Sequence, residues 1–286
     1  MLPFPILDDI LVKFLREDVG FGDITSESLI SPLVTAEGRI ITRSTGILAG
    51  TPFAKRLFEL VDVSVTLPVQ DGTALTPGDA VLMFKGRAKN ILLAERVVLN
   101  ILTRLSGIAT ATHQVVSIAQ QTNPNVRIAA TRKTTPGFRY FEKYAVQIGQ
   151  GDPHRFGLSD AVLIKDNHLI LIESIPRAIE LAKQNVSFGK IIEIEVESVN
   201  DAVLAAKHNA DAILLDNMST TTIEDVDRSL KELNLRKRVI LEASGGITLQ
   251  NVAEYAEYVD IVSLGALTHS VTALDFSLEL EYPNQE

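Results

Sequence analysis

The sequence predicts an α/β fold whose second half is built from repeated strand and helix units. Six short apolar runs follow Pro124 at intervals of roughly twenty to thirty residues, a spacing typical of parallel β/α units. Amphipathic segments such as 202–208 and 252–258 lie between most of the runs and suit covering helices. The six runs are Ile128–Ala130, Ala161–Ile164, Ile191–Val196, Ala212–Leu215, Val239–Leu241 and Ile261–Leu264. Their alternation with helices predicts a β/α barrel or a doubly wound sheet.

The first part of the chain follows a different pattern. Apolar residues recur at helical spacing between Leu7 and Leu15, and the glycines at 20 and 22 indicate a loop after this helix. Short strands and turns are expected over residues 36–88, with β-rich stretches at 39–43 and 81–84. This region therefore predicts a separate, sheet-containing domain.

A long helix is predicted next, with Asn90 as a candidate cap. Ser106 and Gly107 are expected to bend or interrupt it, and a second helical stretch covers residues 111–121. The domain join is expected between Ser106 and Pro124.

The composition excludes several classes of protein. The chain has 286 residues, 27 Lys and Arg against 36 Asp and Glu, a net charge of −9 and no cysteine. Disulfides, zinc–thiolate sites and a cysteine nucleophile are therefore excluded. The negative charge disfavours non-specific binding of nucleic acid.

The sequence predicts neither membrane insertion nor export. The most apolar helical stretch, 91–105, is interrupted by Glu95, Arg96 and Arg104, and residues 1–9 contain no basic segment. We expect a cytoplasmic protein.

Polar residues or glycines follow all six apolar runs, and these positions meet at one rim if the strands are parallel. They are Arg132 and Lys133, Lys165–His168, Glu195 and Glu197, Asp216-Asn217, Glu242–Gly246, and Gly265. Charges also flank buried strands simply where a chain reaches solvent. The convergence of both signs of charge with glycines nevertheless favours a functional site.

Basic side chains are dense between residues 131 and 168. They are Arg132, Lys133, Arg139, Lys143, His154, Arg155, Lys165 and His168. Such a cluster can bind a small dianion, with arginine supplying bidentate contacts. For Arg139 and Lys143, a solvated network with Glu142 is the simpler interpretation.

Carboxylates follow the basic cluster. Glu193, Glu195 and Glu197 share one face of a strand, and unpaired acids are not tolerated in an apolar core. They must face solvent, cations, a metal or a substrate, and a solvated edge strand is the simpler alternative. Asp216 directly ends an apolar run. Oxygen ligands of this kind suit Mg²⁺ bound together with substrate phosphates.

Ser244, Gly245, Gly246 and Gly265 suggest a phosphate site, because glycine lets backbone N–H groups approach an anion closely. Cations, carboxylates and a phosphate-binding loop together fit transfer of a phosphorylated sugar. Two alternatives remain at this point. One is an aldolase that forms a Schiff base through Lys165 or Lys133. The other is a non-catalytic binder of phosphorylated metabolites.

Ten sequence strings, in order along nearly the whole chain, carry a family resemblance. They are Glu17–Thr25, Ala94–Arg96 with Leu99-Asn100, Leu105–Thr110, Thr131–Gly137, His154-Arg155, Leu163–His168, Glu195–Glu197, Leu215–Met218, Glu242–Ile247 and Gly265–Ser270. On these strings, the chain resembles the quinolinate phosphoribosyltransferases. One departure is Gly149-Gln150-Gly151, where the family usually has three glycines.

The resemblance implies an N-terminal α/β sandwich domain (residues 1–110, joined by 271–286) and a C-terminal open β/α barrel (111–270). It implies phosphoribosyl transfer from phosphoribosyl pyrophosphate to quinolinate with decarboxylation, a step in NAD biosynthesis. It also implies an obligate homodimer whose active sites each receive Arg96 from the partner subunit.

The resemblance further assigns roles to individual residues. Arg132, His154, Arg155, Lys165 and His168 belong to the part that binds quinolinate, and Lys133 lies near phosphoribosyl pyrophosphate. Glu195 and Asp216 bind the ribose hydroxyls and Mg²⁺. Ser244, Gly245, Gly246 and Gly265 bind the 5′-phosphate. Lys133, Lys165, Glu195 and Asp216 are expected to be the catalytic residues.

Overall fold

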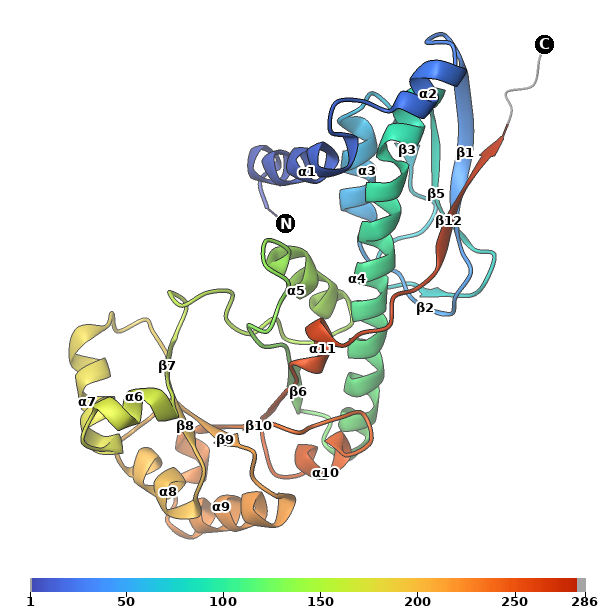
Figure 1. Cartoon of the computed structure of the whole chain (residues 1–286). Coiled ribbons are helices and arrows are strands. Elements are labelled where there is room, and N and C mark those ends of the chain that lie inside the picture. The colour runs from blue at the N-terminus through green and yellow to red at the C-terminus, as the bar shows by residue number, and fades with distance from the viewer. Residues whose placement is uncertain (1, 282–286) are drawn as a thin grey trace. The chain divides into compact units, whose positions relative to one another are not determined.

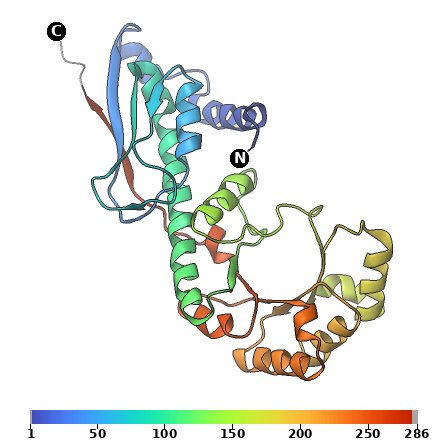
Figure 2. The same cartoon turned by 180° about the vertical axis from the view of Figure 1, so that it is seen from behind.

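The computed structural model describes residues 2–281, and contacts within it divide the chain into two units (Figures 1 and 2). The first unit comprises residues 1–111 and 271–286, and the second comprises Thr112–Ser270. The sequence placed the corresponding limits at residues 110 and 270. Residues 282–286 of the expected returning segment lie outside the described residues.

The first unit contains an antiparallel sheet with the strand order β12-β1-β5-β3. The strands are β1 (Thr35–Thr42), β3 (Ser64–Thr66), β5 (Ala80–Arg87) and β12 (Phe276–Glu281), and a separate pair is formed by β2 (Gly46–Ile47) and β4 (Ala74–Leu75). Because β12 pairs with β1, the end of the chain adds a strand to this unit. Arg39 opposes Glu279 in that pairing, and their side chains form an ion pair at 3.1 Å.

Helices complete the first unit as an α/β sandwich. They are α1 (Phe4–Val19), α2 (Ile24–Leu29), α3 (Thr51–Glu59) and the first part of α4 (Ala88–Thr122). Helix α3 packs on the sheet, where the ring centroids of Phe58 and Phe84 lie 5.3 Å apart. The side chain of Asp23 caps α2 by accepting bonds from the N–H groups of Thr25 and Ser26.

Helix α4 corrects two expectations. It is one continuous helix of 35 residues, so Ser106 and Gly107 do not interrupt it. Ser106 instead bonds the backbone of Ala49, and a Cβ at Gly107 would lie 2.5 Å from the carbonyl oxygen of Thr272. These two residues therefore allow close packing of neighbouring segments. The helix begins at Ala88, and the Asn90 side chain donates to the carbonyl of Val61 instead of capping.

The second unit is an open barrel of six parallel strands. They are β6 (Arg127–Ala129), β7 (Val162–Ile164), β8 (Ile192–Val196), β9 (Ala212–Asp216), β10 (Ile240–Ser244) and β11 (Ile261–Ser263). The strand order is β6-β11-β10-β9-β8-β7, so the first strand pairs with the last. This pairing distinguishes a barrel from a doubly wound sheet, and the predicted fold class is confirmed.

Helices connect the strands and cover their outer face (Figure 1). They are α5 (Arg139–Ile148), α6 (Asp166–Leu171), α7 (Ile175–Asn185), α8 (Val199–Lys207), α9 (Thr220–Glu232), α10 (Val252–Ala256) and α11 (Ala266–His269), with a 3₁₀ turn η1 at Arg236–Arg238. Within residues 2–281, no helix combines the length and apolarity needed to cross a bilayer.

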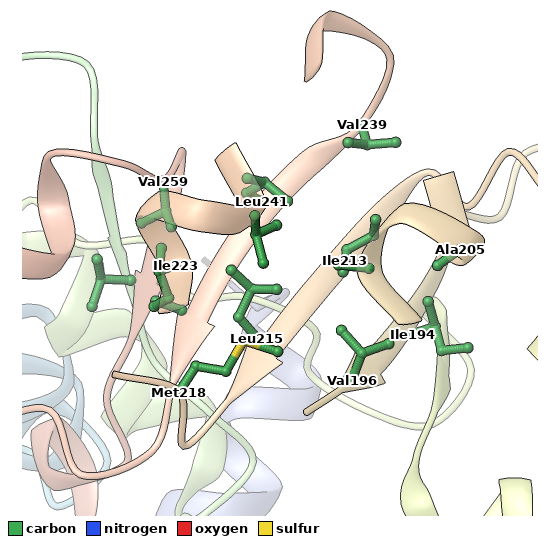
Figure 3. Close-up of a cluster of buried hydrophobic side chains, with 14 of the residues drawn as sticks. Ile194, Val196, Ala205, Ile213, Leu215, Met218, Ile223, Val239, Leu241 and Val259 are labelled. Atoms are coloured by element: carbon green, nitrogen blue, oxygen red, sulfur yellow. The ribbon is translucent and has the colours of Figure 1, made fainter. Parts of the chain in front are cut away.

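Along the barrel strands, side chains that pack under the helices alternate with side chains that face the inside of the barrel. Side chains of Ile194, Ile213, Leu215 and Leu241 point outward and join the apolar cluster under the helices (Figure 3). Their neighbours in sequence point to the opposite face, because side chains along a strand alternate. That inner face carries acids and hydroxyls, including Glu195.

The barrel is open between β6 and β7, which are not paired with each other. Residues 152–155 occupy this opening. Asp152 exchanges backbone hydrogen bonds with Ile128 and Ala130 beside β6, at 2.7 and 2.9 Å. On the other side, Nη1 of Arg155 donates to the carbonyl of Ala161, just before β7, at 3.5 Å. The segment that carries His154 and Arg155 therefore spans the gap.

Candidate active site

A cavity of about 350 Å³ lies at the carboxyl ends of the barrel strands. Its lining residues are Ala130, Thr131, Arg132, Lys133, His154, Arg155, Leu163, Lys165, Glu195, Leu214, Asp216, Glu242, Ser244 and Ser263. Eight of the predicted site residues are thus brought together: Arg132, Lys133, His154, Arg155, Lys165, Glu195, Asp216 and Ser244.

Two arginines line the cavity and could bind an anion. Nε of Arg132 is buried and has no hydrogen-bond partner within the described part of the chain. Burial, followed by the positive charge of Arg132, lowers the pKa of Arg155. A buried, unpartnered donor beside a second guanidinium is unfavourable in the free protein and becomes favourable when a dianion binds.

Acids on adjacent strands face the basic side. The Lys165 ammonium donates to Oε2 of Glu195 at 2.5 Å, and Oδ2 of Asp216 accepts from the Asn217 amide at 2.7 Å. Among residues 2–281, these are the side-chain hydrogen bonds of the two carboxylates, and one oxygen of each is left available. Two carboxylate oxygens at neighbouring strand ends fit the ligand preference of Mg²⁺.

The predicted phosphate-binding glycines lie beside the cavity but not in its lining. Gly245 has φ +92°, and a Cβ there would lie 2.2 Å from Oδ1 of Asn217 and 2.9 Å from its backbone nitrogen. Gly246 also has a positive φ of +62°. At Gly265, a Cβ would lie 2.9 Å from Cδ of Lys133. Glycine is therefore required by backbone conformation at 245 and 246 and by contact with Lys133 at 265.

Two predicted residues lie elsewhere. His168 does not line the cavity, and its Nδ1 accepts the backbone N–H of Lys165 at 3.0 Å. It therefore holds the backbone of a cavity residue at the start of α6. Arg96 is exposed on α4 in the first unit.

Sequence reasoning named two further glutamates but did not assign them to the site. Glu193 and Glu242 are only 4% and 2% exposed. Together with His154 they form a cluster whose candidate ligand atoms lie within 4.8 Å of one another. The alternative that the glutamates of this segment belong to a solvated edge strand is wrong, because β8 lies between β7 and β9 and buries Glu193.

The apolar run hid the position of Glu242. The run appeared to end at Leu241, which placed Glu242 in a loop with Ser244 and the glycines. Strand β10 in fact continues to Ser244, so Glu242 is inside the strand and on the inner face. Side chains alternate along a strand, so counting on from the outward-facing Leu241 would have placed Glu242 on the inner face.

Helix α5 and the loop between it and His154 also correct an expectation. Lys143 is not part of a solvated network, because its side chain is fully buried and Nζ donates to the carbonyl of Pro153. Burial, followed by the charge of Arg139, lowers the pKa of Lys143 to about 8. Gln150 has φ +70°, so it adopts the left-handed conformation that a glycine would adopt without strain.

A larger hollow of about 600 Å³ surrounds Arg236 in the same unit. Its guanidinium bonds Asp227 at 2.8 Å and both carboxylate oxygens of Asp260 at 3.0 Å. These charges satisfy one another and hold the 3₁₀ turn against β10 and β11, so this hollow has a structural explanation.

The buried pair of acids predicts a pH-dependent stability. Burial, followed by the negative charge of Glu242, raises the pKa of Glu193 from 4.5 to about 8. The folded protein keeps the proton on Glu193 at pH values where the unfolded chain has lost it. The contribution of Glu193 to the free energy of unfolding is therefore fully present below pH 4.5 and is lost as the pH rises towards 8. We expect Glu193→Gln, which resembles the protonated acid, to raise the melting temperature by several degrees more at pH 8 than at pH 5.

Thermal unfolding of both proteins across this pH range measures the effect. Glu197→Gln is the matched control, because Glu197 follows the same strand and is exposed. An equal change in melting temperature at pH 5 and pH 8 would contradict the raised pKa of Glu193.

Comparison with known proteins identifies relatives along most of the chain. Residues 23–106 match the family described as quinolinate phosphoribosyl transferase, N-terminal domain, and residues 108–279 match its C-terminal domain. A probable nicotinate-nucleotide pyrophosphorylase [carboxylating] from Archaeoglobus fulgidus is 46% identical over 91% of this chain and 98% of its own. The human nicotinate-nucleotide pyrophosphorylase [carboxylating] is 37% identical over 98% and 93%.

Solved structures agree with these matches. The crystal structure of NadC from Streptococcus pyogenes superimposes with a TM-score of 0.92 at 39% identity, and the alignment covers 99% of both chains. The nicotinate-nucleotide pyrophosphorylase from Francisella tularensis gives a TM-score of 0.89 at 35% identity over 98% of both chains.

Proposed function

Because the chain belongs to the quinolinate phosphoribosyl transferase family, we infer that it transfers the phosphoribosyl group of phosphoribosyl pyrophosphate to quinolinate with decarboxylation. The products are nicotinate mononucleotide, pyrophosphate and CO₂, and the reaction belongs to NAD biosynthesis. The observation that carries this assignment is the cavity in which Arg132 and Arg155 face Glu195 and Asp216.

The basic side of the cavity is suited to the quinolinate dianion. Arg132 supplies a buried, unpartnered Nε, and Arg155 lies beside it as a second guanidinium. Lys165 is a third cation on the cavity wall. The family resemblance includes His154 and His168 in the part that binds quinolinate. His168 does not line the cavity, and its Nδ1 accepts the backbone N–H of Lys165. Neutralising both substrate carboxylates leaves the ring nitrogen free to attack the anomeric carbon.

The acidic side is suited to the sugar. Departure of pyrophosphate leaves positive charge on the ribose, and Glu195 and Asp216 can stabilise this charge from the ends of β8 and β9. When bound between them, Mg²⁺ would offset the negative charge of the pyrophosphate. Lys133, which lines the same cavity, is proposed to bind this leaving group. Its backbone carbonyl accepts a hydrogen bond from Oγ1 of Thr268 at 2.7 Å.

The 5′-phosphate is assigned to the loop after β10 and the start of α11. Ser244 lines the cavity, and Gly245 and Gly246 follow it with positive φ angles. Gly265 lies against Lys133 on the neighbouring strand end. Backbone N–H groups in such a loop can bind phosphate without a cationic side chain.

The active form is proposed to be a homodimer in the cytoplasm. Arg96 is exposed, and it belongs to a different unit of the chain from the cavity residues. We assign it to the cavity of the partner subunit, as the family resemblance implies. Higher assembly is compatible with this arrangement.

Schiff-base chemistry is disfavoured for Lys165. Its Nζ donates to Oε2 of Glu195 at 2.5 Å, so the nitrogen that a Schiff base requires is already engaged by a carboxylate.

The assignment is tested with purified protein, quinolinate, phosphoribosyl pyrophosphate and Mg²⁺. We expect release of CO₂ and pyrophosphate in equal amounts, and loss of turnover when EDTA removes the metal. Turnover of nicotinate in place of quinolinate would contradict the substrate, and full activity in EDTA would contradict the metal. Borohydride trapping of a covalent adduct would support the aldolase instead.

A further inference from the structure

We propose that Glu242 is a positioning residue, which holds the ring of His154 and through it the direction of Arg155. The inference extends the proposed function, because it explains how one of the quinolinate-binding arginines is kept in place. It begins with the opening between β6 and β7, where residues 152–155 are not part of a regular strand.

The backbone at His154 adopts a conformation that few non-glycine residues adopt. Its φ is +52°, in the left-handed region. Such a conformation is strained and persists where the surroundings enforce it. Oδ1 of Asp152 accepts the His154 N–H at 2.6 Å and contributes to this constraint.

The imidazole ring is fixed at both nitrogens. Nδ1 accepts the backbone N–H of Arg155 at 2.8 Å. Since a backbone N–H can only donate, Nδ1 carries a lone pair and the ring proton is on Nε2. Nε2 lies 3.1 Å from Oε2 of Glu242 and therefore donates to it.

This arrangement also argues against a metal at the cluster. A metal needs a free imidazole lone pair, and here the single lone pair of His154 already accepts from Arg155. Oε2 of Glu193 lies 3.9 Å from Nε2, behind the Glu242 contact. The cluster therefore supports a tautomer, and the ring acts on the substrate through the position of Arg155.

The consequence is a chain of contacts from strand β10 to the segment that spans the gap between β6 and β7. Glu242 is held by strand β10, in register with Leu214 of β9. It fixes His154, which fixes the backbone N–H of Arg155, and Arg155 then lines the cavity beside Arg132. Without the Glu242 carboxylate as acceptor, the His154 ring can rotate. Arg155 then loses the contact that fixes its backbone N–H.

Two substitutions separate this role from a charge effect. Glu242→Gln keeps an oxygen that accepts the Nε2 proton, whereas Glu242→Leu has similar volume and no acceptor. We expect the leucine variant to raise the KM for quinolinate about tenfold, with the KM for phosphoribosyl pyrophosphate changed less than about twofold. The glutamine variant should stay within about threefold of the wild type for both substrates. Glu197→Leu is the control for loss of an acid near the same rim, because Glu197 is exposed and does not line the cavity.

A larger effect on phosphoribosyl pyrophosphate, or equal losses in the two variants, would overturn the inference. In a His154→Asn background, Glu242→Leu should cause no further rise, because the contact is already absent. An additive rise in the double variant would also overturn it.

A spectroscopic measurement tests the same claim without turnover. The chain has five histidines, so ring-¹⁵N-labelled histidine gives few signals, and His154→Asn identifies the relevant pair. The wild type and Glu242→Gln should show a protonated Nε2 and an unprotonated Nδ1. A protonated Nδ1 in the wild type would overturn the positioning role, whereas absence of product from quinolinate would overturn only the proposed function.

Discussion

Replacement of Arg132 by lysine should raise the KM for quinolinate by about 100-fold, because lysine cannot reproduce two parallel hydrogen bonds to a carboxylate. The Arg132 Nε is buried and without a partner in residues 2–281, so the free protein keeps this donor ready for a ligand. Lysine would retain the positive charge, but its ammonium group is compact and lacks the planar fork of the guanidinium. The resulting loss, about 2.7 kcal/mol, corresponds to the loss of charge-assisted hydrogen bonds.

Steady-state kinetics with each substrate varied in turn will measure the effect. The KM for phosphoribosyl pyrophosphate should change far less, since Glu195, Asp216 and the phosphate loop remain intact. Arg228→Lys is the control, because Arg228 is exposed on α9 and pairs with Asp225. An unchanged KM for quinolinate would refute the role of Arg132.

Mixing two inactive variants should restore activity if Arg96 serves the opposite subunit. Arg96→Ala and Lys165→Ala should each lower kcat/KM by about 100-fold or more. In a mixed dimer, one cavity receives both defects and the other receives none. Random exchange makes half of the dimers mixed, so activity should recover to about a quarter of the wild type.

Dimers carrying two different tags establish that exchange occurred. Mixing Lys165→Ala with Arg132→Ala is the control, because both residues line one cavity within a single unit and no intact site can form. Verified mixed dimers without recovered activity would place Arg96 in its own subunit's site or make it structural.

The residue pattern predicted parallel β/α units because the buried residues of such units follow simple physical rules, and the family resemblance selected the barrel over a doubly wound sheet. The runs around Ile213 and Val262 are apolar because they pack under helices, and each observed strand overlaps its predicted run. The positions of Lys165, Glu195 and Asp216 followed from the rule that parallel strands end at one rim.

The missing parts depend on contacts between distant segments. Glu242 was placed in a loop because the apolar run stops before the strand does. Glu193 is buried inside the sheet, and its neighbour His154, 3.9 Å away, comes from a loop across the barrel opening. Likewise, the glycine at 107 suggested a break in α4, although it instead accommodates the backbone at Thr272. The secondary-structure propensity of a short segment does not depend on contacts with distant parts of the chain, so it cannot predict them.

The alternation along β8, β9 and β10 has a consequence for engineering and for divergence. Residues such as Ile194 and Leu215 determine how firmly the barrel holds together, while the adjacent Glu195 and Asp216 face the reactants. Substitutions at the outward positions should therefore change mainly stability, and substitutions at the inward positions that line the cavity should change mainly substrate preference. A library confined to the inward positions should yield folded proteins with altered chemistry more often than a library spread over both sides.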